Sequence, residues 1–229
     1  EPGATFQCSV SNVTDAPEPC TSPYTRVPEL TPDGSWTFKV WQTDEAGNEQ
    51  VAAPASFTFT LDSLPPALPT FATLPPLVTN DTTPTFAFTG EPGATFECSL
   101  LGGFAACASP LTVGAIEGTH TFTVRAVDAA GNRGPEAMRS ITIDTTLPTV
   151  PSLVSPPATI GNDATPTFAF AGEPSATFQC SLTTGADNFT GCTSPFTATL
   201  LVAGDYVFKV RQIDQATNVG PVVSRPYSL

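Results

Sequence analysis

The chain has 229 residues, of which 8 are Lys or Arg and 21 are Asp or Glu, so its formal net charge is −13 at pH 7. This charge argues against nucleic-acid binding and against contact with an anionic membrane, because both need clustered basic residues. The 25 prolines and 17 glycines disfavour long helices, whereas 16 phenylalanines are more than a disordered chain carries. Apolar runs are too short to insert into a membrane as a helix of about 20 residues. We therefore expect an acidic, all-β chain.

Three copies of one sequence unit fill the chain. The first landmark is EPGATFQC, which returns as EPGATFEC and EPSATFQC at Glu1–Cys8, Glu91–Cys98 and Glu173–Cys180. The second landmark is an alternating apolar run that ends in a polar turn, at Trp36–Asn48, His120–Asn132 and Tyr206–Asn218. Cys98 and Cys180 lie 82 residues apart. Self-similarity at a fixed period indicates tandem domains, and we predict a first repeat at 1–62, a second at 63–144 and a third at 145–229.

Within each repeat the apolar residues alternate with polar ones. Phe86 and Phe88 have one parity, and Thr85 and Ala87 have the other. Strict alternation predicts strands with one buried and one exposed face. Each repeat has about seven such runs separated by Gly, Pro, Asn and Asp, which is typical of an antiparallel β-sandwich of the immunoglobulin or fibronectin type III kind. The connectors are rich in proline, which stiffens them, so we expect the sandwiches to form a rod.

The first repeat is shorter than the others at its N-terminal side. The second and third repeats carry a leading strand and an NDxTPTFAF strand, at Asn80–Phe88 and Asn162–Phe170, before the EPGAT motif. The first repeat begins at that motif, so we predict that it lacks its two N-terminal strands. Either the chain is a piece of a longer array, which we favour, or a neighbouring chain donates the strands.

Each repeat contains two cysteines, separated by 12, 9 and 12 residues. The first cysteine follows the EPGAT motif, and the second precedes a Ser-Pro pair. No CxxC spacing occurs and His120 is the only histidine, which argues against a metal site. We predict the disulfides Cys8–Cys20, Cys98–Cys107 and Cys180–Cys192. Because such bonds persist outside the reducing cytosol, they predict an extracellular or cell-surface location.

A catalytic site is not expected. His120 occupies the position of Trp36 and Tyr206 in the other repeats, which indicates packing at the rim of the core. No GxSxG elbow occurs, and no second histidine is available for a triad. We predict that the chain is not an enzyme.

An acidic motif of the form DxxxN closes the second landmark of each repeat, opening at Asp44, Asp128 and Asp214. Asp and Asn at this spacing favour a hydrogen-bonded turn between strands. Carboxylate and amide oxygens are also ligands for Ca²⁺, which needs six to eight of them. One repeat supplies too few, but a junction with the next repeat could complete the shell. Both interpretations stay open at this point, the turn being favoured.

Together EPGATFEC, GTHTFTVRAVDAAGN and the Asp-Thr-Thr-x-Pro that ends the second repeat resemble the bacterial Ig-like tandem repeats of large secreted and surface proteins, adhesins above all. The resemblance spans all three repeats. It implies stalk domains that hold a terminal binding domain away from the cell, many of them stiffened by Ca²⁺ at the junctions. The calcium candidates that it implies here are Asp44, Asp62, Asp128, Asp144 and Asp214. The cysteine pairs depart from many adhesin repeats.

Three functions follow as hypotheses. The first is a structural segment of an extracellular rod or fibre that spaces or displays a binding domain, with neighbouring Ig-like repeats of the same or another chain as partners. The second is a homopolymer, in which the chain is a filament or sheath subunit that shares strands with its neighbours. The third is a spacer or carbohydrate-binding module of a secreted hydrolase. Trp41 is a candidate sugar platform, but Arg125 and Arg211 replace it in the other repeats.

Overall fold

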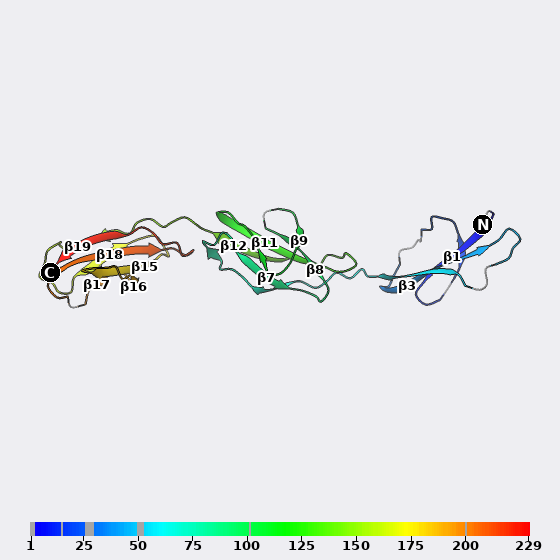
Figure 1. The fold of residues 1–229 in the computed structure, drawn as a ribbon, viewed down its shortest axis with the longest axis horizontal. Coiled ribbons are helices and arrows are strands. Elements are labelled where there is room, and N and C mark those ends of the chain that lie inside the picture. The colour runs from blue at the N-terminus through cyan, green and yellow to red at the C-terminus, as the bar shows by residue number, and fades with distance from the viewer. Residues whose placement is uncertain (1–2, 15, 26–29, 50–52, 101, 200) are drawn as a thin grey trace. The chain divides into compact units, whose positions relative to one another are not determined.

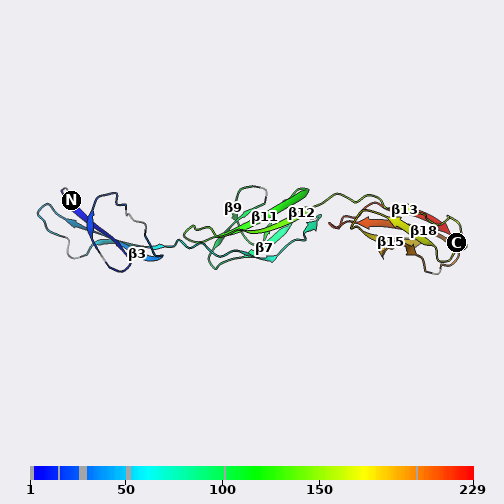
Figure 2. The same cartoon turned by 180° about the vertical axis from the view of Figure 1, so that it is seen from behind.

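The computed structural model describes residues 3–14, 16–25, 30–49, 53–100, 102–199 and 201–229. Figure 1 shows its strands in chain order from β1 in blue to β19 in red, and Figure 2 shows the same strands from behind. Strands and turns make up the described residues, and none of these residues forms a helix able to cross a membrane. The all-β prediction is therefore confirmed.

The first repeat forms a single sheet. Its strands are β1 (Thr5–Ser11), β2 (Glu18–Cys20), β3 (Gly34–Thr43) and β4 (Ala55–Leu61). They pair antiparallel in the order β2-β1-β3-β4. Among the described residues of 1–62 no second sheet is present, in agreement with the prediction that this repeat lacks two strands of the full set.

The second repeat contributes two sheets, ordered β10-β7-β5 and β6-β12-β11-β8-β9. Its strands are β5 (Thr70–Thr73), β6 (Val78–Thr79), β7 (Thr85–Thr89), β8 (Thr95–Ser99), β9 (Ala105–Cys107), β10 (Leu111–Thr112), β11 (Gly118–Val127) and β12 (Ala137–Ile143). One pair departs from the antiparallel expectation, because β6 runs parallel to β12.

The third repeat repeats this plan with sheets ordered β13-β14-β17 and β16-β15-β18-β19. Its strands are β13 (Ser152–Val154), β14 (Thr167–Ala171), β15 (Thr177–Thr183), β16 (Thr190–Cys192), β17 (Phe196–Thr197), β18 (Asp205–Ile213) and β19 (Val223–Ser228). An isolated parallel bridge between Ile160 and Ser228 stands where the second repeat has β6.

Phenylalanines from facing sheets make the two cores. The ring of Phe86 on β7 stacks on Phe122 of β11 with 4.1 Å between centroids, and Phe168 on β14 stacks on Phe208 of β18 at 4.2 Å. All four side chains are fully buried. Burying one such side chain stabilises the fold by about 1.5–3 kcal/mol, so the alternation read from the sequence is what joins the sheets of each sandwich.

The chain divides into two compact units, one of residues 1–69, 90–97 and 125–136 and the other of residues 70–89, 98–124 and 137–229. The division passes through the second predicted repeat. Its turns at residues 90–97 and 125–136 fall in the same unit as the connector that precedes the repeat. The repeat boundaries at 62/63 and 144/145 stay predictions.

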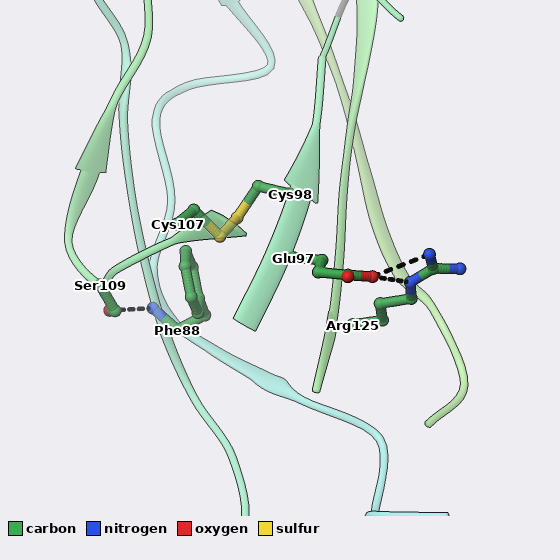
Figure 3. Close-up of a disulfide and its surroundings, with 6 residues drawn as sticks. All are labelled: Phe88, Glu97, Cys98, Cys107, Ser109 and Arg125. Carbon is green, nitrogen blue, oxygen red and sulfur yellow. Dashed lines mark hydrogen bonds and ion pairs between the residues drawn. A yellow bond between two sulfur atoms is a disulfide. The ribbon is translucent and has the colours of Figure 1, made fainter. Parts of the chain in front are cut away.

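A disulfide joins an edge strand to its neighbour in the four- or five-stranded sheet of each repeat, namely β2 to β1, β9 to β8 and β16 to β15. The bonds are Cys8–Cys20, Cys98–Cys107 and Cys180–Cys192, and there is no free cysteine. Figure 3 shows the second bond beside the core residue Phe88, whose backbone N–H donates to the hydroxyl of Ser109 at 2.8 Å. In the chain-entropy model, closing a loop of this size stabilises the fold by about 3 kcal/mol.

Candidate functional site at the two linkers

Two proline-rich connectors are held by turns of the repeat that follows them. We call Asp62–Pro69 the first linker and Asp144–Pro151 the second linker. Pro66 and Pro148 are buried at equivalent positions. The turns that contact each linker are the DxxxN turn and the turn of the EPGAT motif, and we describe the two linkers separately.

The DxxxN turns are closed by their own side chains. The backbone N–H of Asn132 donates to Asp128 Oδ1 at 2.9 Å, and its side-chain Nδ2 donates to Asp128 Oδ2 at 2.9 Å. Asp214 accepts the same pair of hydrogen bonds from Asn218, at 2.8 and 2.9 Å. These bonds form the Asx-type turn that the spacing predicts. Because ionised carboxylates accept hydrogen bonds best, the side-chain bond from Asn132 holds the pKa of Asp128 below its usual value.

The left-handed position of this turn explains its glycine. Gly131 has φ = 92°, and Thr217 occupies the same position in the third repeat with φ = 74°. A β-branched residue rarely adopts this conformation. Thr217 nevertheless takes this conformation, so the turn of the third repeat keeps its shape without the glycine.

The amide of the DxxxN asparagine also reaches the linker. Asn132 Nδ2 donates to the backbone carbonyl of Asp62 at 2.9 Å, and Asn218 Nδ2 donates to that of Asp144 at 2.7 Å. One amide group thus closes its own turn and binds the start of the linker.

Two glycines permit a close approach further along each linker. A Cβ at Gly134 would lie 2.5 Å from the carbonyl oxygen of Pro66, and one at Gly220 would lie 2.8 Å from that of Pro148. Real Cβ atoms are not found under 3.0 Å from such an atom. These two positions therefore require glycine for contact with the linker rather than for backbone conformation.

The glutamate that opens the EPGAT motif binds the centre of the linker. Glu91 accepts the backbone N–H of Ala67 at 3.1 Å. Glu173 accepts both the backbone N–H and the hydroxyl of Thr149, at 2.7 and 2.8 Å. The backbone bond from Thr149 is the main reason that the pKa of Glu173 is lowered.

Among the described residues, a further clamp holds the second linker and has no equivalent at the first. Gln212 is fully buried, its Oε1 accepts the N–H of Glu173 at 2.9 Å, and its Nε2 donates to the carbonyl of Thr149 at 2.6 Å. The equivalent position in the second repeat is Ala126, which is also fully buried.

The repeat before each linker holds the first residues of that linker. Ser63 donates its backbone N–H and hydroxyl to Asp33 at 3.1 and 2.8 Å, and Thr145 donates the same two groups to Glu117 at 2.8 and 2.6 Å. The hydroxyl bond from Thr145 is the main cause of the lowered pKa of Glu117. Each linker is thus hydrogen-bonded at its start by the repeats on both sides of it, and at its centre by the repeat that follows.

The five aspartates proposed as calcium ligands all accept backbone N–H groups. Asp62 accepts from Leu64 and Asp144 accepts from Thr146, each at 3.1 Å. Asp44 binds Asn48 through backbone and side chain at 2.7 Å, and the side-chain bond is the main cause of its lowered pKa. Asp128 and Asp214 bind Asn132 and Asn218 as described above. Within the described ranges, no group of three or more His, Cys, Asp or Glu side chains could hold a metal ion. Calcium binding at the five aspartates stays a prediction.

Sequence reasoning identified the DxxxN motif but not what it contacts. Glu91 and Glu173 appeared there only as part of a repeat landmark, and Gln212, Gly134 and Gly220 were not singled out. The available signal was the glycine that stands two residues after the motif's asparagine in DAAGNRG and DQATNVG, at Gly134 and Gly220.

His120 lies at the packing position that the sequence indicates. Its Nε2 lies 2.7 Å from the backbone oxygen of Ile116, while Trp36 and Tyr206 donate to the backbone oxygens of Pro32 and Val202. Each partner lies four residues before the aromatic ring. The shared contact assigns the histidine to a structural role.

The chain is similar to solved structures of fibronectin-type modules and of a bacterial adhesin. The fibronectin(III)-like modules of Clostridium thermocellum CbhA match at 14% identity and a TM-score of 0.44, over 70% of this chain and 93% of that one. The chicken CNTN1 FN1–FN3 domains match at 11% identity and 0.45, over 99% and 90%. A bacterial ice-binding adhesin matches at 13% identity and 0.38, over 98% and 85%. No family model and no curated protein matches the chain.

Proposed function

We propose that the chain is a structural segment of an extracellular protein, in which tandem β-sandwich repeats space or display a binding domain, as in an adhesin stalk or a surface fibre. The observation that carries the proposal is the double contact of the DxxxN asparagine, in which Asn132 binds Asp62 and Asn218 binds Asp144. A flexible tether would need no such contact, whereas a spacer needs linkers with one conformation.

The disulfides support the extracellular part of this proposal. Each closes a short loop within its own repeat, and all six cysteines are used. Disulfides of this kind persist in oxidising compartments. The excess of acidic residues also suits a solvated surface chain rather than one bound to nucleic acid or an anionic membrane.

The experiment is a measurement of relative tumbling. Residual dipolar couplings of the full chain report whether residues 63–144 and 145–229 share one alignment tensor. A spacer predicts a shared tensor that Asn218→Ala weakens, while Asn48→Ala leaves it unchanged because the bonds of Asn48 among the described residues close its own turn with Asp44. Independent tensors in the unsubstituted protein would contradict the proposal.

A filament subunit is a second candidate, favoured by the single sheet of the first repeat, which leaves the Phe57 side chain 66% exposed. Sedimentation equilibrium over a hundredfold range of concentration tests it. A filament subunit predicts species that grow with concentration, and a monomer at every concentration would exclude it.

A further inference from the structure

A carboxylate of the first repeat holds the start of the first linker. Asp33 Oδ2 accepts the backbone N–H of Ser63 at 3.1 Å, and Asp33 Oδ1 accepts the hydroxyl of the same serine at 2.8 Å. Both residues are exposed. The bend that carries the carboxylate is fixed by Trp36, whose ring N–H donates to the carbonyl of Pro32 at 3.1 Å. Solvent therefore reaches a carboxyl group that is held in place at both of its oxygens.

The residue that follows this carboxylate is a glycine. Asp33-Gly34 is the only Asp-Gly pair in the sequence, and no Asn-Gly pair occurs. The backbone nitrogen after an aspartate can attack the carbon of the side-chain carboxyl group, and a side chain on the following residue hinders this attack. Glycine has no side chain, and no described atom lies within 4 Å of a Cβ placed on Gly34. The space that a ring at this position needs is therefore open.

We propose that the Asp33–Gly34 peptide bond is a site of spontaneous aspartate isomerisation, that Ser63 restrains the reaction, and that the isoaspartate releases the start of the first linker. The reaction needs no enzyme and no cofactor, and its only co-reactant is water. It gives the first linker a covalent change that goes beyond a spacing role.

The reaction has two steps, and no group is oxidised or reduced in either. The backbone nitrogen of Gly34 attacks Cγ of Asp33, an N–Cγ bond forms, and one carboxyl oxygen leaves as water with the amide proton and a proton from solvent. The product is a five-membered succinimide ring. Water then adds to one of the two ring carbonyls. Addition at Cγ breaks the new bond and restores aspartate, whereas addition at the former main-chain carbonyl breaks its bond to nitrogen and leaves isoaspartate with the original mass.

Ser63 restrains the first step because it is bonded to both oxygens of the carboxylate. One of these oxygens has to leave as water, so at least one of the two hydrogen bonds must open first. Gly34 is the first residue of β3, where it lies opposite Leu61, and the ends of strands open most readily. The ring therefore forms in molecules in which the start of the linker has detached from Asp33.

Isoaspartate removes the group to which the linker is bound. The former side-chain carboxyl group becomes part of the main chain, which then has one additional carbon atom before Gly34. The new free carboxylate is attached directly to Cα, one bond closer to the backbone, so it cannot keep the two bonds to Ser63. We expect the preceding repeat to lose its hold on the linker, while Asn132 of the following repeat still donates to the carbonyl of Asp62.

The second linker is held by a matched residue that resists the reaction. Glu117 occupies the position of Asp33, is followed by Gly118, and accepts the N–H and the hydroxyl of Thr145 at 2.8 and 2.6 Å. Its side chain is one methylene longer, so attack by the glycine nitrogen has to close a six-membered imide. That ring forms far more slowly than the five-membered one. The same hold is therefore chemically stable at the second linker and can be lost at the first.

The test ages the full chain at neutral pH and physiological temperature and samples it over several weeks. Electron-transfer fragmentation locates isoaspartate in each sample, and labelling by protein isoaspartyl methyltransferase gives an independent total. We expect isoaspartate to accumulate at position 33 faster than at any other aspartate. Amide chemical shifts should change at Ser63 and Leu64 in proportion to the isomerised fraction, and they should stay constant at Thr145.

Matched variants separate the chemistry from the restraint. Asp33→Glu should abolish the product at position 33, and Glu117→Asp should create a second site at position 117. Ser63→Ala removes one of the two restraining hydrogen bonds, so isoaspartate at position 33 should form about two- to tenfold faster. Gln212→Ala is the control for general destabilisation, because it acts in the third repeat, and it should leave the rate at position 33 unchanged.

Several results would overturn the proposal. One is an isoaspartate content at position 33 no higher than at the other aspartates. Another is an unchanged rate in Ser63→Ala, or equal acceleration by Ser63→Ala and Gln212→Ala, either of which would show that the contact with Ser63 does not restrain the reaction. Isoaspartate at position 33 with unaltered amide shifts at Ser63 would show that the linker is not released.

Discussion

The two linkers begin alike and differ at their centres. Both start with an aspartate whose carbonyl accepts an asparagine amide, and both place a proline carbonyl against a glycine. At the centre, Ala67 makes one bond to Glu91, whereas Thr149 makes two to Glu173 and also binds Gln212. The difference teaches that the residues common to both linkers set where a linker docks, and that the residues that differ between them set how firmly it is held.

The largest effect should come from the Gln212 clamp at the second linker. Gln212→Ala leaves the N–H of Glu173 and the carbonyl of Thr149 without their buried partner, so we expect the free energy of unfolding to fall by about 2–3 kcal/mol. Gln42 has the same position in the first repeat and is half-buried, and Gln42→Ala should cost within about 0.5 kcal/mol. Native-state hydrogen exchange of β14 and β18 measures the first loss. Equal losses in the two variants would show that the clamp contributes nothing.

The next largest effect should come from the close approach between a glycine and a proline carbonyl oxygen, which both linkers share. Gly134→Ala and Gly220→Ala each place a Cβ against a backbone oxygen, so we expect each to cost about 1–3 kcal/mol or to displace the linker. Gly103→Ala is the control, because nothing lies within 4 Å of its added Cβ. Urea denaturation followed by circular dichroism measures all three variants. A neutral result at 134 and 220 would mean that the linkers do not need these contacts.

A smaller effect separates the turn from the linker contact. Asn132→Ala and Asn218→Ala remove both functions of the amide, whereas Asn48→Ala removes the turn bond alone. We expect about 0.5–1.5 kcal/mol more destabilisation from the first two variants, with Asn218 the more costly because it is more buried. Thermal unfolding of the three variants gives the difference. Three equal losses of stability would show that the hydrogen bond from the asparagine to the linker does not stabilise the fold.

The pH dependence should also distinguish the second linker. The pKa of Glu173 is lowered by its bonds from Thr149. A carboxyl whose pKa is lower in the folded state than in the unfolded state stabilises the folded state at pH values above the unfolded-state pKa. This contribution is lost as the pH falls through the folded-state pKa. We therefore expect the second linker to loosen only below the ordinary pKa of 4.5. An NMR titration of the side-chain carboxyl carbons measures the pH at which the linker loosens. Glu173→Gln should remove this pH-dependent transition. A transition near neutral pH would contradict this assignment.

The smallest expected effect is that of calcium. Each of the five aspartates already accepts N–H groups, so Ca²⁺ and NaCl at equal ionic strength should shift the melting temperature equally. A further rise with Ca²⁺, lost in Asp144→Ala, would establish the calcium site that the resemblance implies.

The sequence predicts the parts of this molecule that depend on local pattern. The alternating phenylalanines, the paired cysteines and the DxxxN turns lie where the repeats indicate. Gln212 could not be found in this way, because it has no counterpart in the second repeat, where Ala126 stands. The role of Glu173 also could not be read, since its partner Thr149 lies 24 residues earlier and only the folded chain brings them together.

The parallel pairing of β6 with β12 was likewise not predictable. Val78–Thr79 is too short to show an alternating pattern, and its partner Thr142–Ile143 is distant in sequence. Short strands of this kind are specified by the packing around them rather than by their own residues.

The disulfides limit how far a repeat can lengthen under tension. A polypeptide pulled straight gains about 3.3–3.6 Å per residue, but residues between bonded cysteines cannot be extended while the bond holds. Cys8–Cys20 and Cys180–Cys192 each span 12 residues of sequence, which withholds about 40 Å of extension per repeat. Under load, a repeat that unfolds therefore gains less extension than its number of residues implies. Reduction of the disulfide allows the rest of that extension.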